Sequence, residues 1–220
     1  MYDPKFKQTK CKPTKLLSTI AVVCTFGLSA SVTAATLEDI QQRWSKCQYD
    51  VFNKDNKVTC FEQVITDNQT ALNKEPGRND LKVWLAINKS SLAGAEGGLG
   101  ALSLVKESKK LLEDVIQKEP EVLDGSAFTS LGSLYYKVPG WPIGFGDDDM
   151  AETMLKKALA INPNGIDPNY FYGDFLAEEG QKAQAVAYLK KAQQAEPRLN
   201  RELADRGRQQ EITNRLKELQ

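Results

Sequence analysis

The sequence predicts an all-α fold of about four antiparallel helix pairs followed by a C-terminal capping helix, and three observations predict it. Four prolines close successive segments of similar length: Pro76, Pro120, Pro163 and Pro197. Proline ends a helix because it has no backbone N–H and its ring clashes with the preceding turn. Small residues such as Gly173 and Ala185 recur where two helices would have to approach closely. No long apolar stretch interrupts the pattern after residue 35.

The segment from 166 to 199 carries the clearest repeat. Its spacing is that of a 34-residue tetratricopeptide (TPR) unit: Gly173, Ala185, Leu189, Ala192 and Pro197. Units of this kind stack through their apolar faces, so the sequence predicts a TPR-like α-solenoid. The expected parts of one domain over 36–220 are the pairs 36–78, 79–122, 123–165 and 166–199 and the capping helix 200–220.

The two middle pairs depart from the clean repeat by insertions. In the pair 123–165, Gly132 and Ala151 stand further apart than the matching Gly173 and Ala185, so extra residues lie between the two helices. The pair 79–122 has an insertion around 95–100. These insertions are the places where the chain exceeds what a repeat requires.

Residues 1–35 have the pattern of a secretory signal peptide. Lysines precede a short apolar run, 16–28, and small residues then offer cleavage after Ala34 or Ala35. This predicts export to the periplasm. A lipoprotein acylated at Cys24 is the alternative, but Val23 is larger than the small residue usual before an acylated cysteine. The apolar run is shorter than the roughly 20 residues that span a bilayer, so no stable membrane insertion is expected after cleavage.

Two cysteines, Cys47 and Cys60, follow the signal segment. In an oxidising compartment such a pair predicts a disulfide that ties the two helices of the first pair together. A loop of this length would stabilise the fold by roughly 3 kcal/mol in the chain-entropy model. A redox-active pair is the alternative, and it lacks the Cys-x-x-Cys spacing.

Composition excludes several classes of function. The chain has no histidine, which excludes Ser-His-Asp and Cys-His catalysis and histidine-ligated zinc or haem. Acidic residues that could form a catalytic carboxylate pair fall at helix starts or on solvated faces among Lys and Arg. We therefore expect no enzyme, no cofactor and no metal site. After residue 35 acidic residues outnumber basic ones, and no basic patch with interleaved aromatics predicts nucleic-acid binding.

The inserted segment 135–149 is rich in proline and glycine, so it is expected to be a loop. It carries three large apolar residues, Trp141, Ile143 and Phe145. A loop that exposes such residues needs a reason. Either it packs onto its own stack, or it forms the wall or lid of a binding site, and both can hold together.

A concave groove is the expected binding surface. Asp167 and Pro168 look like a helix cap and a first-turn proline, which would direct Tyr170 into the groove with Asp174 and Glu178 one and two turns later. The equivalent positions of the two preceding pairs are Tyr136 with Lys137, and Lys82 with Lys89. A groove that runs from basic to acidic with tyrosine at its centre suits an extended peptide or a partner helix. The alternative is that these are ordinary solvated helix faces.

Three blocks carry a family resemblance: GWPIGFGDDD, INPNGIDPNYFYGDFL and RELADRGRQQEI. From 127 to 216 the chain resembles a family of exported bacterial TPR proteins, and more distantly it is similar to TatT, the T-component associated with TRAP transporters. The resemblance implies a non-enzymatic protein that binds a protein or peptide partner. The TatT likeness implies an alternative, an accessory of a solute uptake system that pairs with a transporter substrate-binding subunit and holds a small apolar ligand near Trp141 and Phe145.

Overall fold

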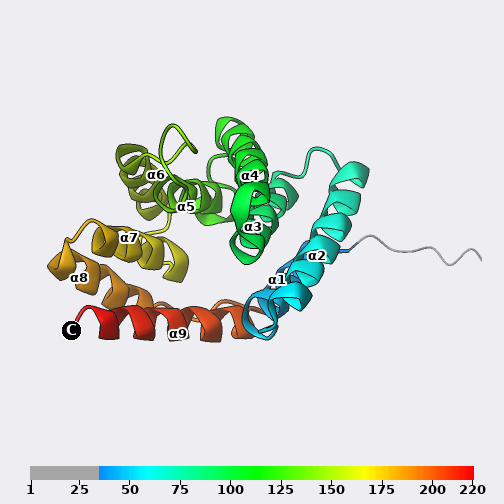
Figure 1. Ribbon diagram of the computed structural model, residues 1–220. Helices are drawn as coiled ribbons and strands as arrows, with labels where there is room; N and C mark the ends of the chain where they lie inside the picture. Colours follow the sequence, from blue (N-terminus) through cyan, green and yellow to red (C-terminus); the bar gives the residue numbers. More distant parts are fainter. Residues whose placement is uncertain (1–34) are drawn as a thin grey trace, which may run out of the picture. The chain divides into compact units, whose positions relative to one another are not determined.

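The computed structural model describes residues 35–220; the predicted signal peptide and Cys24 lie outside the described residues. Within this range the chain forms four successive helix pairs and a last helix (Figure 1). The elements are α1 (Leu37–Tyr49), α2 (Lys54–Lys74), α3 (Asn79–Glu96), α4 (Gly98–Lys118), α5 (Val122–Lys137), α6 (Asp148–Ile161), α7 (Ile166–Glu178), α8 (Lys182–Gln193) and α9 (Glu202–Glu218). The predicted all-α, TPR-like fold class is confirmed for this part of the chain.

Small residues bring the helices of a pair together, as the repeat pattern predicts. A Cβ added at Gly132 of α5 would lie 2.7 Å from Cγ of Leu155 on α6. One added at Gly173 of α7 would lie 2.9 Å from Cγ of Leu189 on α8. Both distances are shorter than a carbon–carbon contact allows, so a larger residue at either position would separate the pair.

Helix starts are capped by side chains at several ends. Thr36 and Asp39 form a capping box at α1, in which the Asp39 N–H donates to the Thr36 hydroxyl over 3.1 Å. Asp147 caps α6 by accepting from the Met150 N–H over 2.9 Å. The four backbone N–H groups that open a helix need such acceptors because no earlier carbonyl reaches them.

The two insertions are accommodated differently. The insertion around 95–100 lengthens α3 and α4, which meet at Gly97 with a φ of 68°. The insertion before α6 forms a true loop over 138–147. Only the second therefore changes the surface of the stack by adding non-helical chain.

Cys47 and Cys60 form a disulfide between α1 and α2, with their Cα atoms 5.6 Å apart. Cys47 is fully buried among the apolar residues of the first pair. The first pair is thus cross-linked as expected.

Helix α9 does more than cover the last pair. It packs against α8 and α7, and it also packs against α1 of the first pair. Its residue Ala204 belongs to the apolar cluster that contains Trp44 and Trp84. In Figure 1, α9 extends from beside α8 to the first pair. The sequence predicted a cap on one end of the stack; the structure shows that α9 joins the first pair to the last.

Helix α5 begins with an unusual turn. Leu123, Asp124 and Gly125 have φ angles of 51°, 53° and 74°, and the right-handed helix starts after them. Non-glycine residues rarely adopt this left-handed conformation because Cβ crowds the following carbonyl.

Candidate binding cleft

A cleft of about 720 Å³ lies between the first helices of the pairs and α9. We call it the α9 cleft. Residues that line it include Trp44, Tyr49, Trp84, Ser91, Gly94, Ser126, Thr129, Ser130, Ser133, Lys137, Asp167, Tyr170, Asp174, Glu178, Arg201, Arg208, Glu211 and Arg215. A second cleft of about 680 Å³ adjoins it and shares Trp84, Ser126, Thr129, Asp167 and Arg201. Clefts of this size are typical of ligand sites.

An aromatic cluster forms the α1–α3 end of the α9 cleft. The rings of Trp44 and Trp84 meet edge to face with centroids 5.5 Å apart, and Tyr49 meets Trp44 in the same way at 5.8 Å. The Trp44 indole N–H donates to the Ser91 hydroxyl over 2.8 Å. The polar atom of Trp44 is therefore satisfied, while its ring and that of Trp84 give this end a rigid apolar wall.

Hydroxyl groups line the α5 side of the cleft. Ser126, Thr129, Ser130 and Ser133 follow one another at the three- and four-residue spacing that places side chains on one helix face. Among the described residues none of these four hydroxyls has a hydrogen-bond partner within the protein. This row of hydroxyls, which we call the α5 hydroxyl row, is available to a ligand as donors and acceptors.

Arg208 anchors α9 to α7. Its guanidinium is 4.3 Å from the Tyr170 ring centre, and its Nε donates to Asp167 Oδ1 over 2.9 Å. Burial acts to lower the pKa of Arg208, but Asp167, Tyr49 and Glu211 around it hold that pKa above its ordinary value. Burial likewise acts to raise the pKa of Asp167, but the guanidinium groups of Arg198 and Arg208 hold it below its ordinary value. Asp167 is therefore an ion-pair partner, and Gly165 takes the cap position expected for it.

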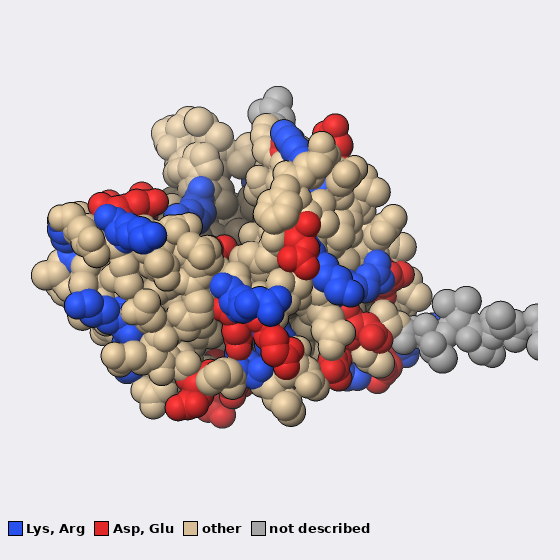
Figure 2. All heavy atoms as spheres, turned by 90° about the horizontal axis from the view of Figure 1, so that it is seen from below, with Lys and Arg blue, Asp and Glu red and all other residues tan. Residues whose placement is uncertain are grey.

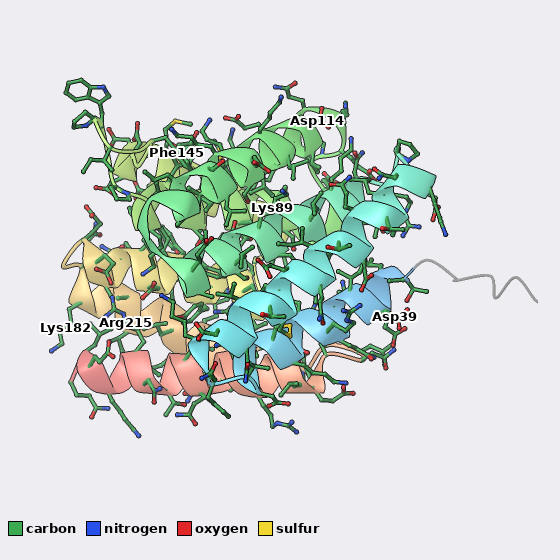
Figure 3. All side chains as sticks on the ribbon, turned by 45° about the vertical axis from the view of Figure 1, so that its right-hand side comes forward. Asp39, Lys89, Asp114, Phe145, Lys182 and Arg215 are labelled. Atoms are coloured by element: carbon green, nitrogen blue, oxygen red, sulfur yellow. A yellow bond between two sulfur atoms is a disulfide. The ribbon has the colours of Figure 1, made fainter. Side chains whose placement is uncertain are left out.

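Arg215 makes a second anchor one heptad later. It pairs with Asp174 over 2.8 Å and also contacts Glu178. Figure 3 shows Arg215 between α9 and the α7–α8 pair. Asp174 is almost fully buried, and it also receives the Tyr136 hydroxyl and the Lys137 ammonium, each over 2.9 Å. Burial, followed by the Asp174 charge, raises the pKa of Tyr136 well above its ordinary value.

The structure thus brings together five of the residues expected in the groove: Tyr136, Lys137, Tyr170, Asp174 and Glu178. Helix α9 contacts three of them, Tyr170, Asp174 and Glu178, although Glu178 stays exposed. These side chains bind the chain's own last helix. Four of the five, Lys137, Tyr170, Asp174 and Glu178, still line the α9 cleft, and their role in binding a partner stays a prediction.

Lys82 and Lys89 do not belong to the cleft. Lys82 pairs with Asp114 over 2.8 Å and Lys89 pairs with Glu107 over 2.6 Å, both on α4. Figure 3 places Lys89 and Asp114 on the α3–α4 pair. Lys82 lies about 200° around the helix from Trp84, which faces the cleft. The predicted groove running from basic to acidic is thus not formed.

The loop 138–147 does not line the α9 cleft. Trp141 at its tip is 90% exposed. Phe145 packs on the stack, with its ring centre 5.8 Å from that of Tyr135. The packing alternative therefore accounts for Phe145, and the loop forms neither a lid nor a wall of the α9 cleft.

Sequence reasoning missed the arginines of the last helix. Arg201, Arg208 and Arg215 recur at seven-residue intervals and all line the cleft. Such spacing predicts one helix face, but the sequence does not show that this face lines a cleft. The α5 hydroxyl row carried a similar signal. The sequence places these four hydroxyls on one helix face, but it does not show that α9 lies opposite that face.

Charges of both signs are interspersed on the face that α9 occupies (Figure 2). In the part of the chain that the structure describes, no group of three metal-binding side chains converges. No helix among residues 35–220 combines the length and the apolar character that crossing a bilayer requires. The cleft can hold a ligand by hydrogen bonds, ion pairs and aromatic contact.

The comparisons with known proteins agree with the repeat. The tetratricopeptide repeat family model matches residues 166–199. A crystal structure of a thermophilic TPR protein from Thermus thermophilus superposes with a TM-score of 0.57 at 20% identity, covering 83% of this chain and 80% of that one. The crystal structure of MamA gives a TM-score of 0.43 at 17% identity, covering 77% and 93% respectively.

No curated protein sequence matches the chain. The first of the two structural likenesses extends over most of the helical part, and at this identity it speaks for the fold alone. Residues 35–220 therefore form an all-helical, TPR-like solenoid, with one tetratricopeptide repeat recognised at residues 166–199.

Proposed function

We propose that this protein is an exported, non-enzymatic scaffold that binds an extended segment of a partner protein in the α9 cleft. TPR-like folds generally serve as protein-interaction scaffolds. The observation that carries the proposal is the α5 hydroxyl row, which faces a cleft and has no partner within the described residues. The backbone of an extended segment offers the N–H and C=O groups that such hydroxyls would bind.

The position of α9 favours an extended segment over a partner helix as the bound group. A partner helix has a diameter of about 10–12 Å with its side chains, and α9 already lies where one would contact Tyr170 and Asp174. The remaining cleft of about 720 Å³ suits a short extended segment. The edge-to-face rings of Trp44 and Trp84 would hold an apolar side chain of that segment at one end.

Export remains part of the proposal. Its support is the charged start, the apolar run and the cleavage sites after Ala34 or Ala35. The capping box of α1 begins at Thr36, so cleavage at either site would leave this helix start intact. N-terminal sequencing of the protein from the periplasmic fraction should give Ala35 or Thr36 as the first residue. A chain that keeps Met1 and stays in the cytoplasm would overturn export.

The TatT-like alternative has less support in this chain. It requires an apolar ligand held between the groove and the loop of Trp141 and Phe145, and neither residue lines the cleft. The α5 side of the cleft is made of hydroxyl groups, which an apolar ligand would leave unsatisfied. A transporter substrate-binding subunit remains compatible with the scaffold as a protein partner.

Site-specific photocrosslinking in the producing cell tests the proposal. A photoreactive residue at position 94 would sit on the cleft side of α3, where an added Cβ meets nothing within 4 Å. The matched control is position 110, exposed on α4 and outside the described clefts. We expect one discrete polypeptide adduct from position 94 and none from 110. Adduct formation should stop when Ser130→Phe and Ser133→Phe fill the cleft.

Equal crosslinking from positions 94 and 110 would contradict the proposal. So would an adduct at 94 that survives the cleft-filling substitutions, because the partner would then bind elsewhere. Correct folding of the filled variant is checked by its circular dichroism and by its intact disulfide.

A further inference from the structure

Arg201, the residue before α9, carries a guanidinium that the protein leaves without a partner. Among the described residues it forms no ion pair, and its buried Nε has no hydrogen-bond acceptor. One of its faces is covered by the Trp84 ring, whose centre is 4.9 Å from the guanidinium carbon. The ring holds the guanidinium in place by a cation–π contact, but it satisfies none of its N–H groups.

The other arginines of this region form ion pairs. Arg198 binds Asp205 over 2.6 Å, Arg208 binds Asp167 over 2.9 Å, and Arg215 binds Asp174 over 2.8 Å. Burial and the neighbouring charge of Arg198 lower the pKa of Arg201 to about 10. Asp167 and Asp205 act in the opposite direction but form no ion pair with it among the described residues, so Arg201 is charged at neutral pH and has no direct carboxylate partner.

A second unpartnered group faces the same space. Thr129 is only 5% exposed, yet it lines both clefts and makes no hydrogen bond among the described residues. Other helical threonines, such as Thr66 and Thr213, donate to the carbonyl four residues earlier. Thr129 would look back to Gly125, whose φ of 74° takes it out of the helix. The left-handed turn therefore leaves the Thr129 hydroxyl without its usual acceptor.

That turn is itself costly. Leu123 and Asp124 hold left-handed conformations that cost on the order of 1–3 kcal/mol each, and such conformations cluster at binding sites. Both residues line the second cleft, which meets the α9 cleft at Ser126, Thr129 and Arg201. Backbone strain, the hydroxyl of a buried threonine and a guanidinium without an ion pair thus converge on one place.

We propose that Arg201, Thr129 and Ser126 bind one carboxylate group of the segment held in the α9 cleft. This inference rests on the proposed function, because it names the group that the segment must carry. A guanidinium and two hydroxyls that line the same two clefts supply the charge and the donors that a carboxylate accepts. Asp167 and Glu211 also line the cleft and would repel a more highly charged group such as a phosphate, so a single negative charge is the best match.

Three pools of random hexapeptides test the site on the purified protein with its disulfide formed. The first pool lacks Asp and Glu and ends in a free carboxylate. The second is identical but ends in an amide, and the third ends in an amide and carries one glutamate at its centre. Peptides retained by the immobilised protein are quantified by mass spectrometry. Retention of the first or the third pool at least ~10-fold above the second is expected, since a hydrogen bond to a charged group contributes ~1.5–3 kcal/mol.

Two variants assign the effect to the site. Arg201→Gln should reduce the difference between the pools to less than ~2-fold, while Arg206→Gln, at an exposed position of the same helix, should leave it unchanged. Thr129→Val keeps the shape and every charge, and it should weaken retention of the favoured pool several-fold without disturbing α9.

The outcomes separate the two proposals. A first-pool preference identifies a chain terminus as the source of the carboxylate, and a third-pool preference identifies an acidic side chain. Equal retention of all three pools, or a preference that survives both Arg201→Gln and Thr129→Val, overturns the carboxylate site and leaves peptide binding intact. Retention of none overturns the proposed function and the carboxylate site with it.

Discussion

Gly207 lets α9 lie directly against α1. A Cβ at this position would overlap the ring of Tyr49, which packs edge to face on Trp44. Burial raises the pKa of Tyr49 well above its ordinary value, which reflects how closely this ring is enclosed. A single hydrogen in place of a methyl group therefore sets the distance between the last helix and the first.

Gly207→Ala should lower the free energy of unfolding by ~1–3 kcal/mol, because the Tyr49 ring or α9 must move. The matched control is Gly94→Ala, at a helical position where an added Cβ meets nothing within 4 Å. Because alanine is the better helix former, this change should raise the free energy of unfolding by ~0.5–1 kcal/mol. Urea unfolding of both variants measures this. Stabilisation by both substitutions would show that the α1–α9 contact is loose.

Asp167 makes the stability sensitive to acid. Arg198 and Arg208 hold its pKa below the ordinary 3.8, so its ionisation stabilises the fold above about pH 4. As pH falls below this value the unfolded chain takes up the proton first and the contribution is lost. Asp167→Asn should cost ~1–3 kcal/mol at pH 7.

Between pH 4 and pH 2, the free energy of unfolding of the Asp167→Asn variant should fall by less than that of the unmodified protein. Urea unfolding at several pH values measures how the free energy of unfolding depends on pH. The matched control is Asp55→Asn, an exposed aspartate of α2 without an ion pair among the described residues. If Asp55→Asn flattens the acid dependence as much as Asp167→Asn does, the buried ion pair is not its source.

At the scale of the element, the loop 138–147 combines one packed aromatic with one exposed aromatic. Phe145→Ala should lower the free energy of unfolding by ~1–3 kcal/mol, because its ring packs on Tyr135 although it is only partly buried. Trp141→Ala should change it by less than ~0.5 kcal/mol, since that side chain is 90% exposed. Thermal unfolding compares the two variants. Equal losses would mean that Trp141 also packs on the stack in solution.

The disulfide between α1 and α2 should support α9 as well as its own pair. Replacing Cys47 and Cys60 by serine should cost roughly 3 kcal/mol for a loop of this length. Because α9 packs on α1, its amides near Gly207 should exchange hydrogen faster in the variant, while those of α6 should change little. Faster exchange confined to α1 and α2 would show that α9 does not depend on the first pair.

At the scale of the whole molecule, α9 links the two ends of a repeat stack. In an ordinary solenoid each repeat contacts only its neighbours, so the terminal repeats fray first. Here α1 and α7 both contact α9. Loosening of either end therefore exposes apolar surface at the other.

A chain that stops after Asn200 tests this coupling. In the full-length protein the amides of α1 and α7 should become exchangeable together, in one cooperative opening. Without α9 both should lose protection, and they should open independently. The central helices α4 and α5, which do not contact α9, serve as the internal control. Unchanged protection of α1 in the truncated chain would contradict the coupling.

The repeat signals in the sequence predicted the helix pairs and the close contacts at Gly132 and Gly173, because these follow from local spacing. The cleft was not predicted. Its lining depends on where α9 docks, and the contact of Gly207 with Tyr49 joins residues from opposite ends of the chain.

The contact between α1 and α9 also has a consequence for the order of events during synthesis. Chains begin to fold from their N-terminus while they are being made, so the surface of α1 that Ala204 and Gly207 will cover is formed long before its cover exists. Until the last helix arrives, that surface is open to chaperones or to another copy of the chain. The Cys47–Cys60 bond can form only once the chain reaches an oxidising compartment, and there it holds the two helices of the first pair together.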